Sequence, residues 1–279
     1  MRVAFADGAV HECPGVAFVG IADDVLLIAD GLAPSECLEI AQSLASSGYI
    51  DYLSIMTSQP RDWRSSAMST VNMSFPVAPY LHLASAIKAA VDIPIFHAGK
   101  IADPATAARA IGDGHLDMVA MTRAHIADPY FVKKMVEGRE DDIRQCVGAN
   151  YCIDRIYTGA EALCIQNPAT GRERTMPQVI SAADKKKTVV VAGAGVAGME
   201  AARVSAERGH RVVLFEAAPE TGGQINTAVK ATWRSGLAGI PRWLDSQVRK
   251  RGVDLRLNTL ATADNVMAEN PDVVIVATG

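Results

Sequence analysis

The chain has 279 residues and a formal net charge of −4, and 49% of its residues are hydrophobic while 5% are aromatic. This length accommodates one large domain or two ordinary ones, and the many aliphatic residues favour helix-rich α/β packing. Because acidic and basic residues are interspersed and leave no basic patch, nucleic acids and anionic membrane surfaces are not expected as partners.

Targeting and membrane signals are not evident in the sequence. No stretch approaches the roughly 18 uncharged apolar residues of a membrane-spanning helix. The first residues, MRVAFADGAVHECPG, lack the basic-then-apolar order of a signal peptide. We therefore expect a cytoplasmic protein whose ligands are small molecules.

Residues 1–145 alternate short apolar runs with amphipathic helical patterns, which is typical of βα units and a parallel sheet. The predicted strands are 16–21, 50–56, 93–97 and 117–121, and we expect a helix after each. Two of these helices share a start signal, Asp103-Pro104 and Asp128-Pro129. In both we expect Asp to be the N-cap and Pro the first helical residue. The Asp carboxylate can accept a hydrogen bond from a backbone N–H of the first turn, which has no partner within the helix, and proline has no backbone N–H that would need one.

The loops after the last two strands of this region each carry a cation. Gly99 and Lys100 follow one strand, and Arg123 follows the other. In (β/α)8 barrels the loops after strands seven and eight bind phosphate through backbone N–H groups and helix N-termini. A flavin phosphate between these three residues is therefore predicted, and the alternative is a pair of solvated loop charges. His97 and His125 are more typical of hydrogen-bonded structural groups than of catalysts.

Residues 146–187 break the alternating pattern and are rich in Cys, Gly, Pro and polar residues, so we interpret them as a connector. Cys146, Cys152 and Cys164 lie close together here. An odd total of five cysteines in a reducing compartment argues against a disulfide framework. Three clustered cysteines favour metal or redox chemistry instead.

From residue 188 a strand, a glycine motif and a helix follow one another, and a second strand ends before Glu216. In a dinucleotide-binding fold, Gly193 would permit the tight turn, Gly195 would let the backbone approach a pyrophosphate, and Gly198 would allow close helix–strand packing. Glu216 would accept hydrogen bonds from ribose hydroxyls, and its acidity favours an unphosphorylated ribose, as in FAD or NAD. The alternative is a glycine-rich turn that binds nothing.

The order of these motifs resembles a known family. DMVAMTRAHIADP, then CVGANYC with EALCIQNPATGRE, then VVVAGAGVAGMEAARVSAERGHRVVLFE are similar to the family of trimethylamine dehydrogenase and 2,4-dienoyl-CoA reductase. The cysteine segment resembles most the bacterial demethylases of N-methylated amino acids, of the dimethylglycine and N-methylproline type. The resemblance implies an α/β chain that comprises the C-terminal half of an FMN-binding (β/α)8 barrel, 1–145, an iron–sulfur-type connector, 146–187, and the start of a Rossmann-like FAD-binding domain, 188–279.

The resemblance also implies roles for individual residues. Gly99, Lys100 and Arg123 become contacts of the FMN phosphate, and Arg2 would lie against the flavin ring. The adenine dinucleotide, FAD or ADP at the same site, would be held by Gly193, Gly195, Gly198, Glu216, Gly223 and Gln224, with the turn Ala277-Thr278-Gly279 beside them. No catalytic acid or base can be assigned.

Ala149 departs from the family, whose amine dehydrogenases have a cysteine at the corresponding place. Four thiolates normally hold a [4Fe–4S] cluster, and alanine cannot bind iron. Cys146, Cys152 and Cys164 could hold a three-iron cluster, a four-iron cluster with another ligand, or nothing. The chain also contains about half of the expected barrel strands, so we expect a fragment with unpaired sheet edges.

Three functions remain open. The first is a flavin-dependent oxidoreductase whose parent demethylates a small N-methylated amine or amino acid and passes electrons through FMN to a second flavin or cluster, and then to an acceptor such as an electron-transfer flavoprotein. The second is an NAD(P)H-dependent enone or 2,4-dienoyl-CoA reductase. The third is a non-catalytic nucleotide-binding fragment. The full-length parent is expected to be a homo-oligomer.

Overall fold

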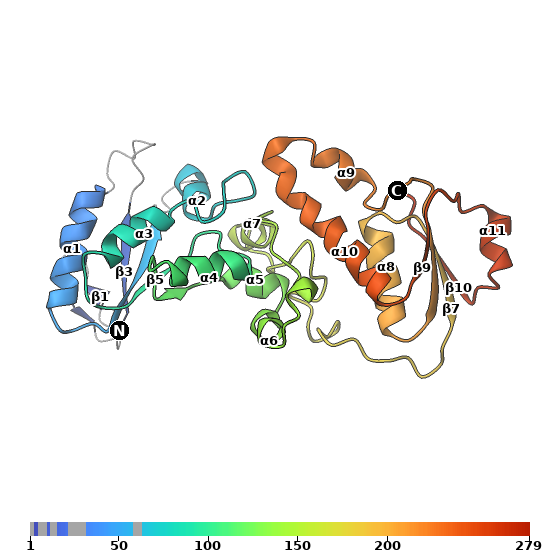
Figure 1. Cartoon of the computed structure of the whole chain (residues 1–279), viewed down its shortest axis with the longest axis horizontal. Helices are drawn as coiled ribbons and strands as arrows, with labels where there is room; N and C mark the ends of the chain where they lie inside the picture. Colours follow the sequence, from blue (N-terminus) through green and yellow to red (C-terminus); the bar gives the residue numbers. More distant parts are fainter. Residues whose placement is uncertain (1–2, 5–9, 12–15, 22–31, 58–62) are drawn as a thin grey trace. The chain divides into compact units, whose positions relative to one another are not determined.

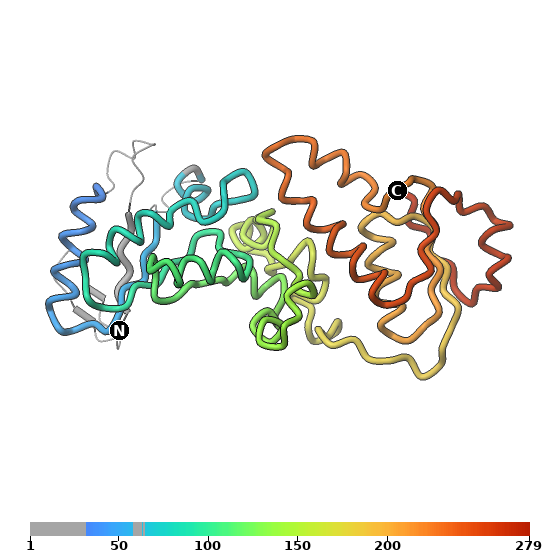
Figure 2. The backbone as a smooth tube through the Cα atoms, in the orientation of Figure 1, coloured from blue at the N-terminus to red at the C-terminus, as the bar shows by residue number. Residues whose placement is uncertain are grey.

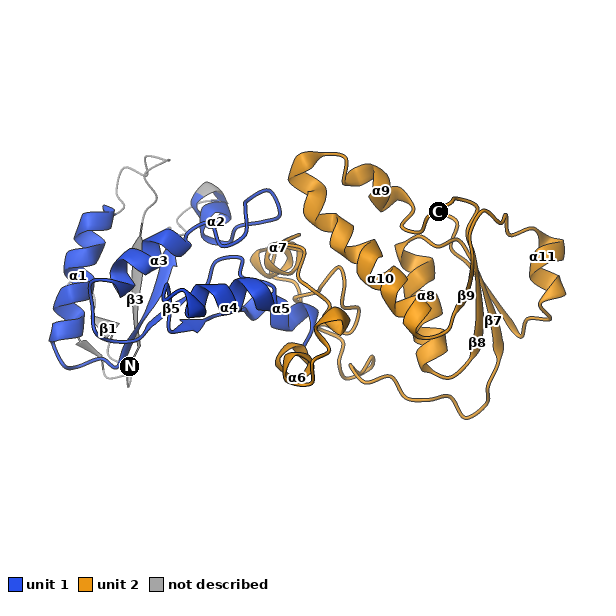
Figure 3. Ribbon diagram, viewed as in Figure 1, with its two compact units in different colours: residues 1–129 blue, residues 130–279 orange. Residues whose placement is uncertain are grey.

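A computed structural model describes residues 3–4, 10–11, 16–21, 32–57 and 63–279 (Figures 1 and 2). The chain forms two compact units, Met1–Pro129 and Tyr130–Gly279 (Figure 3). The predicted domain limits at 145 and 187 stay predictions. No helix among the described residues is both long and apolar enough to cross a bilayer.

Unit 1 contains a four-stranded parallel sheet in the order β3-β4-β5-β6. Its strands are β3 (Val16–Ile21), β4 (Tyr52–Thr57), β5 (Ile95–His97) and β6 (Met118–Val119). Two short strands, β1 (Val3–Ala4) and β2 (Val10–His11), pair antiparallel. The helices are α1 (Pro34–Ser46), α2 (Trp63–Ser69), α3 (Leu81–Lys88), α4 (Pro104–Gly112) and α5 (Thr122–Ala127). The four strands predicted for this region are therefore confirmed, with ends shifted by a few residues.

The core of unit 1 lies between one face of the sheet and its helices. Leu53, Ile55 and Ile95 alternate along β4 and β5 and pack against small residues of the helices, among them Ala84 of α3 and Ala110 of α4. Because side chains alternate between the two faces of a strand, Tyr52 and Phe96 lie on the opposite face. Their rings stack with centroids 4.5 Å apart.

The two Asp-Pro signals have different outcomes. Asp103 is the N-cap of α4, where its side chain accepts a hydrogen bond from the Thr106 N–H at 2.8 Å, and Pro104 is the first helical residue. The prediction for Asp128 is wrong. Its N–H donates to the carbonyl of Ala124, so this residue ends α5, and the next helix, α6 (Phe131–Val136), begins two residues after the proline. The residue before a proline is pushed out of the helical region, which favours a helix end at 128.

Unit 2 contains a second parallel sheet, in the order β10-β7-β8-β9. Its strands are β7 (Thr188–Ala192), β8 (Arg211–Phe215), β9 (Asp254–Arg256) and β10 (Val273–Val276). Besides α6, it contains η1 (Glu140–Asp142), α7 (Tyr151–Tyr157), α8 (Val196–Glu207), α9 (Gln224–Ala228), η2 (Thr232–Ala238), α10 (Gly239–Lys250) and α11 (Ala263–Ala268). β7, which comes first in the sequence, lies inside the sheet between β8 and β10, which comes last. This strand order is that of the doubly wound dinucleotide-binding fold.

Helices cover both faces of this sheet, with α8 and α10 on one side and α11 on the other (Figure 1). Val191 and Leu214 pack against Met199 of α8 and Leu244 of α10. The alternate strand residues, including Phe215, pack toward α11. A sheet covered on two faces explains why β7 is the continuous β-branched run of the sequence.

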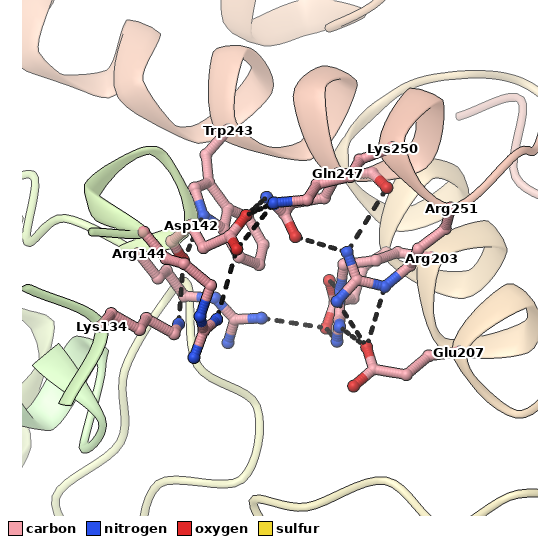
Figure 4. Close-up of polar contacts among 11 residues, drawn as sticks. Lys134, Asp142, Arg144, Arg203, Glu207, Trp243, Gln247, Lys250 and Arg251 are labelled. Carbon is pink, nitrogen blue, oxygen red and sulfur yellow. Dashed lines mark hydrogen bonds and ion pairs between the residues drawn. The ribbon is translucent and has the colours of Figure 1, made fainter. Parts of the chain in front are cut away.

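Asp142, at the end of η1, anchors the first residues of unit 2 to α10 (Figure 4). Its carboxylate accepts hydrogen bonds from Lys250 Nζ and from Gln247 Nε2 at 3.1 Å. Its main-chain carbonyl accepts from Trp243 Nε1 at 3.2 Å and from Lys134 Nζ at 2.9 Å. Residues 130–142 are thereby tied to the Rossmann-like part of the chain.

Candidate functional site

The glycine motif follows β7 at the carboxyl edge of the second sheet, and its three glycines have different surroundings. A Cβ atom at Gly193 would lie 2.5 Å from the carbonyl oxygen of Ala277, and one at Gly198 would overlap the carbonyl oxygen of Gly193. Gly193 also has a φ of +102°. At Gly195 a Cβ atom would meet no atom of the described residues within 4 Å. Packing therefore requires glycine at 193 and 198, whereas Gly195 faces open space.

This space lies at the start of α8. Gly195 is the N-cap residue of the helix, and no side chain among the residues that the structure describes caps it. The first N–H groups of a helix have no intrahelical partner, and the helix dipole favours negative charge there. A backbone that a ligand can approach closely at this point is suited to phosphate.

Glu216 immediately follows β8 and contacts the glycine motif. Its Oε2 atom accepts a hydrogen bond from the Ala194 N–H at 2.7 Å, and its Oε1 atom accepts from the Ala218 N–H at 2.9 Å. These bonds hold the carboxylate beside the loop. Since an ionised carboxylate has about four acceptor positions, it can also accept from hydroxyl groups of a ligand.

A second glycine loop meets the first. The Gly222 N–H donates to the Ala194 carbonyl at 2.9 Å. A Cβ atom at Gly223 would lie 3.2 Å from Gly195 Cα, and one at Gly279 would lie 3.7 Å from the amide nitrogen of Gln224. The structure therefore brings the predicted dinucleotide residues together at one edge of the sheet, from the segments 193–198, 216, 222–224 and 277–279.

In unit 1, the two predicted phosphate cations hold one segment. Lys100 Nζ donates to the carbonyls of Met73, at 3.3 Å, and Phe75. Arg123 Nη1 donates to the carbonyl of Val71 at 2.8 Å. Both side chains are half-buried, so the alternative of two independent solvated charges does not describe them. The segment 71–75 was not identified from the sequence.

His97 is the last residue of β5, and Ala98 separates it from Gly99. Its side chain is completely buried, and its Nδ1 atom lies 2.9 Å from the carbonyl oxygen of Ile55. Burial lowers the pKa of His97, although the hydrogen bond to Ile55 opposes this shift. The ring is therefore neutral near pH 7.

The three connector cysteines are not assembled as a ligand set. Cys152 is buried in α7, and Cys164 Sγ accepts a hydrogen bond from the Gln166 N–H at 3.4 Å. Across the described residues, no group of three or more His, Cys, Asp or Glu side chains is arranged to hold a metal ion. Cys164 instead lines a cavity of about 290 Å³ with Glu200 of α8 and Trp243 of α10. The iron–sulfur cluster on Cys146, Cys152 and Cys164 stays a prediction.

Residues 39–142 match the NADH:flavin oxidoreductase / NADH oxidase family, and residues 191–256 match the NAD(P)-binding Rossmann-like domain. The chain belongs to this flavin oxidoreductase family. The first match contains Gly99, Lys100 and Arg123, and the second contains all six predicted dinucleotide residues. Arg2 precedes both matches and lies outside the described residues.

Individual family members are similar along most of the chain. The "Probable N-methylproline demethylase" of Rhizobium meliloti (strain 1021) is 49% identical over 89% of this chain. The N,N-dimethylglycine/sarcosine dehydrogenase of Chromohalobacter salexigens is 47% identical over 90% of it. The solved structure of a 2-naphthoyl-CoA reductase in complex with 2-naphthoyl-CoA matches 95% of the chain with a TM-score of 0.86 and 37% identity.

The chain spans only part of these relatives, namely 37% and 36% of the two bacterial proteins and 39% of the reductase. Within that part, the predicted fold class is confirmed. It is an α/β chain with a barrel-type parallel sheet followed by a Rossmann-like sheet.

Proposed function

We propose that this chain forms part of a flavin-dependent oxidoreductase that oxidatively demethylates a small N-methylated amine or amino acid. The observation that carries the proposal is the meeting of Gly195, Glu216 and Gly223 at one sheet edge, with open space at the start of α8. The names of the two bacterial relatives support the substrate class.

We assign FMN to unit 1. Gly99, Lys100 and Arg123 would hold its phosphate at the carboxyl ends of β5 and β6, where parallel α/β folds bind phosphate. The two cations already converge on the segment 71–75, which supports a single site rather than two separate loops. When bound, FMN supplies the hydride-accepting chemistry that amino-acid side chains lack.

We assign the second nucleotide, FAD or ADP, to unit 2. The main chain at Gly195 would receive the pyrophosphate, and Glu216 would accept from the ribose hydroxyls. Gly193 and Gly198 shape the turn, while Gly223 and Gln224 close its other side. The open space at Gly195 supports this fit, since a ligand can approach the backbone there.

In the proposed reaction, the N-methyl carbon of the substrate gives up a hydride equivalent. Water then adds to the resulting iminium carbon, which releases formaldehyde and the demethylated amine. The two electrons pass to an external acceptor such as an electron-transfer flavoprotein. The contribution of the chain is to hold and orient the reactants, which lowers the entropic part of the barrier.

A second candidate is reduction of a conjugated enone or acyl-CoA with electrons from NAD(P)H. It is supported by the likeness to the 2-naphthoyl-CoA reductase structure, at 37% identity. The electron source separates the two candidates, since demethylation needs no nicotinamide.

Anaerobic flavin reduction tests the proposal. The purified chain is loaded with FMN and mixed with sarcosine or N,N-dimethylglycine, and glycine serves as the control that lacks an N-methyl group. Loss of flavin absorbance with the methylated compounds alone supports demethylation, whereas loss with NAD(P)H alone supports the reductase. A chain that binds no FMN contradicts both candidates and favours a non-catalytic fragment.

The iron–sulfur prediction has its own test. Iron and acid-labile sulfide are measured in the purified chain and in a Cys164→Ala variant. Stoichiometric iron that is lost in the variant supports a cluster, and iron-free chain contradicts it.

A further inference from the structure

The two ring nitrogens of His97 have different surroundings. Nδ1 lies 2.9 Å from the carbonyl oxygen of Ile55, its neighbour across the β4–β5 pair. A carbonyl oxygen only accepts hydrogen bonds, so the ring proton is on Nδ1. The neutral ring consequently presents Nε2 as an acceptor.

Within the described part of the chain, Nε2 has no hydrogen-bond donor although it is buried. Buried polar atoms are nearly always paired, because leaving one unpaired costs the full desolvation of that atom. An unpaired buried acceptor therefore points to a donor from outside the described residues, such as a water molecule.

Nε2 is directed at the loop that we assign to the flavin phosphate. A Cβ atom at Gly99 would lie 2.7 Å from Nε2 and 3.3 Å from Cε1 of the same ring. The φ of Gly99 is not in the left-handed region, so backbone conformation does not demand glycine there. Glycine is required because the imidazole of His97 occupies the place of a side chain.

The next residue fixes the other side of this loop. Lys100 has a φ of +55°, its carbonyl accepts from the Ala78 N–H at 3.4 Å, and its Nζ atom donates to the segment 71–75. The main chain at Gly99 and Lys100 is therefore held between the buried ring of His97 and the segment that Lys100 contacts.

We infer that His97 is a positioning residue for the phosphate group of FMN, with its ring setting the position of Gly99 and its Nε2 atom accepting a hydrogen bond from a water molecule held at the phosphate. This inference rests on the proposed function, because it assumes that the loop receives a flavin phosphate. It assigns no role to His97 in hydride transfer.

Two amide substitutions distinguish the contributions of the two ring nitrogens to FMN binding. Asparagine places an amide near Nδ1 and keeps a donor for the Ile55 carbonyl, whereas glutamine reaches the position of Nε2. Affinities for FMN and for riboflavin, which lacks the phosphate, are measured by flavin fluorescence in the purified chain. We expect His97→Asn to weaken FMN binding about tenfold, because the variant loses the hydrogen bond at Nε2 and the support that the ring gives to Gly99. Riboflavin binding should be unchanged. His97→Gln should recover most of the FMN affinity.

A double-mutant cycle tests the contact with Gly99. Gly99→Ala should weaken FMN binding in the wild-type background, because the new methyl group meets the imidazole. In the His97→Asn background the same change should cost much less, since the ring is gone. The exposed His82, changed to Asn, is the matched control and should leave both flavin affinities unchanged.

The outcomes distinguish the inference from the function on which it rests. Suppose that the wild-type chain binds FMN. The inference alone is then overturned if the His97→Asn variant binds FMN equally well, or if it loses affinity for FMN and riboflavin alike. Additive effects of the two substitutions also overturn it. A wild-type chain that does not bind FMN overturns the proposed function as well. Thermal unfolding of each variant shows that the compared chains are folded.

Discussion

The carboxylate of Asp142 is bound by the ammonium group of Lys250, with Nζ at 2.7 Å from Oδ1 and 2.8 Å from Oδ2. Burial opposes ionisation of this carboxyl group, but hydrogen bonds from Lys250, Gln247 and Arg139 outweigh it and lower the pKa of Asp142 to about 2. One short helical turn and the end of α10 are joined at this point.

Asp142→Asn should lower the free energy of unfolding by about 1–3 kcal/mol near pH 7, because Lys250 and Gln247 lose a charged acceptor. The ordinary pKa of an Asp carboxyl group is 3.8, so the stabilisation is present above that pH and is lost as the pH falls toward about 2. Urea unfolding should therefore show the difference between wild type and variant shrinking below pH 3.8. The exposed neighbour Asp141, changed to Asn, is the control. An equal loss in both variants would contradict this assignment.

Gly195→Val should abolish binding of ADP or FAD to unit 2 and leave the fold intact. A Cβ atom at 195 meets no atom of the described chain within 4 Å, and the side chain that it carries fills the space that a pyrophosphate needs. Isothermal titration with ADP, together with thermal unfolding, measures both properties. Gly112 in α4 also faces open space, so Gly112→Val provides a glycine control. Unchanged ADP affinity in Gly195→Val would remove the dinucleotide assignment.

Gly198→Ala should act on stability instead. Its Cβ atom would overlap the carbonyl oxygen of Gly193 and crowd the methyl group of Ala277, so strand and helix must move apart. We expect a loss of about 1–3 kcal/mol in the free energy of unfolding, the usual result of overpacking. Chemical denaturation of the chain without ligand checks this. A variant as stable as wild type would show that the turn is not tightly packed.

The stability of the chain should fall as the solution becomes acidic, in part because of His97. Its folded-state pKa lies below the ordinary value of 6.5, so the unfolded chain takes up a proton more readily. The stabilisation is thus complete above pH 6.5 and is lost as the pH falls below that value. The His97→Asn variant should show a shallower decline in unfolding free energy over this range. Parallel curves for both chains would contradict a buried neutral histidine.

Identical dipeptides show where the sequence is insufficient. Asp103-Pro104 begins α4 as predicted, whereas Asp128-Pro129 follows directly on α5. The N–H of Asp128 donates a hydrogen bond to the carbonyl of Ala124 in the last turn of α5. Both pairs carry the same local signal. The difference comes from the preceding residues, which form a loop before Asp103 and helix α5 before Asp128.

The glycine motif was predicted at the correct place because spacing, strand and acidic residue occur together. The motif also predicted different roles for its glycines, and the structure shows that packing requires Gly193 and Gly198, whereas Gly195 faces open space. By contrast, Lys100 and Arg123 were predicted from the strand ends, but their common partner, the segment 71–75, is remote in sequence and carries no motif. Long-range contacts of this kind have no local sequence signal.

The contact between Gly193 and Ala277 also sets an order of events for a growing chain. These residues are 84 positions apart (277 − 193), yet the turn of the first and the backbone of the second are in contact. A contact of such high sequence separation forms late, since the intervening loop must close first. During synthesis, the nucleotide turn would therefore be incomplete until β10 and Ala277 have left the ribosome, and affinity for the nucleotide would arise only after that point.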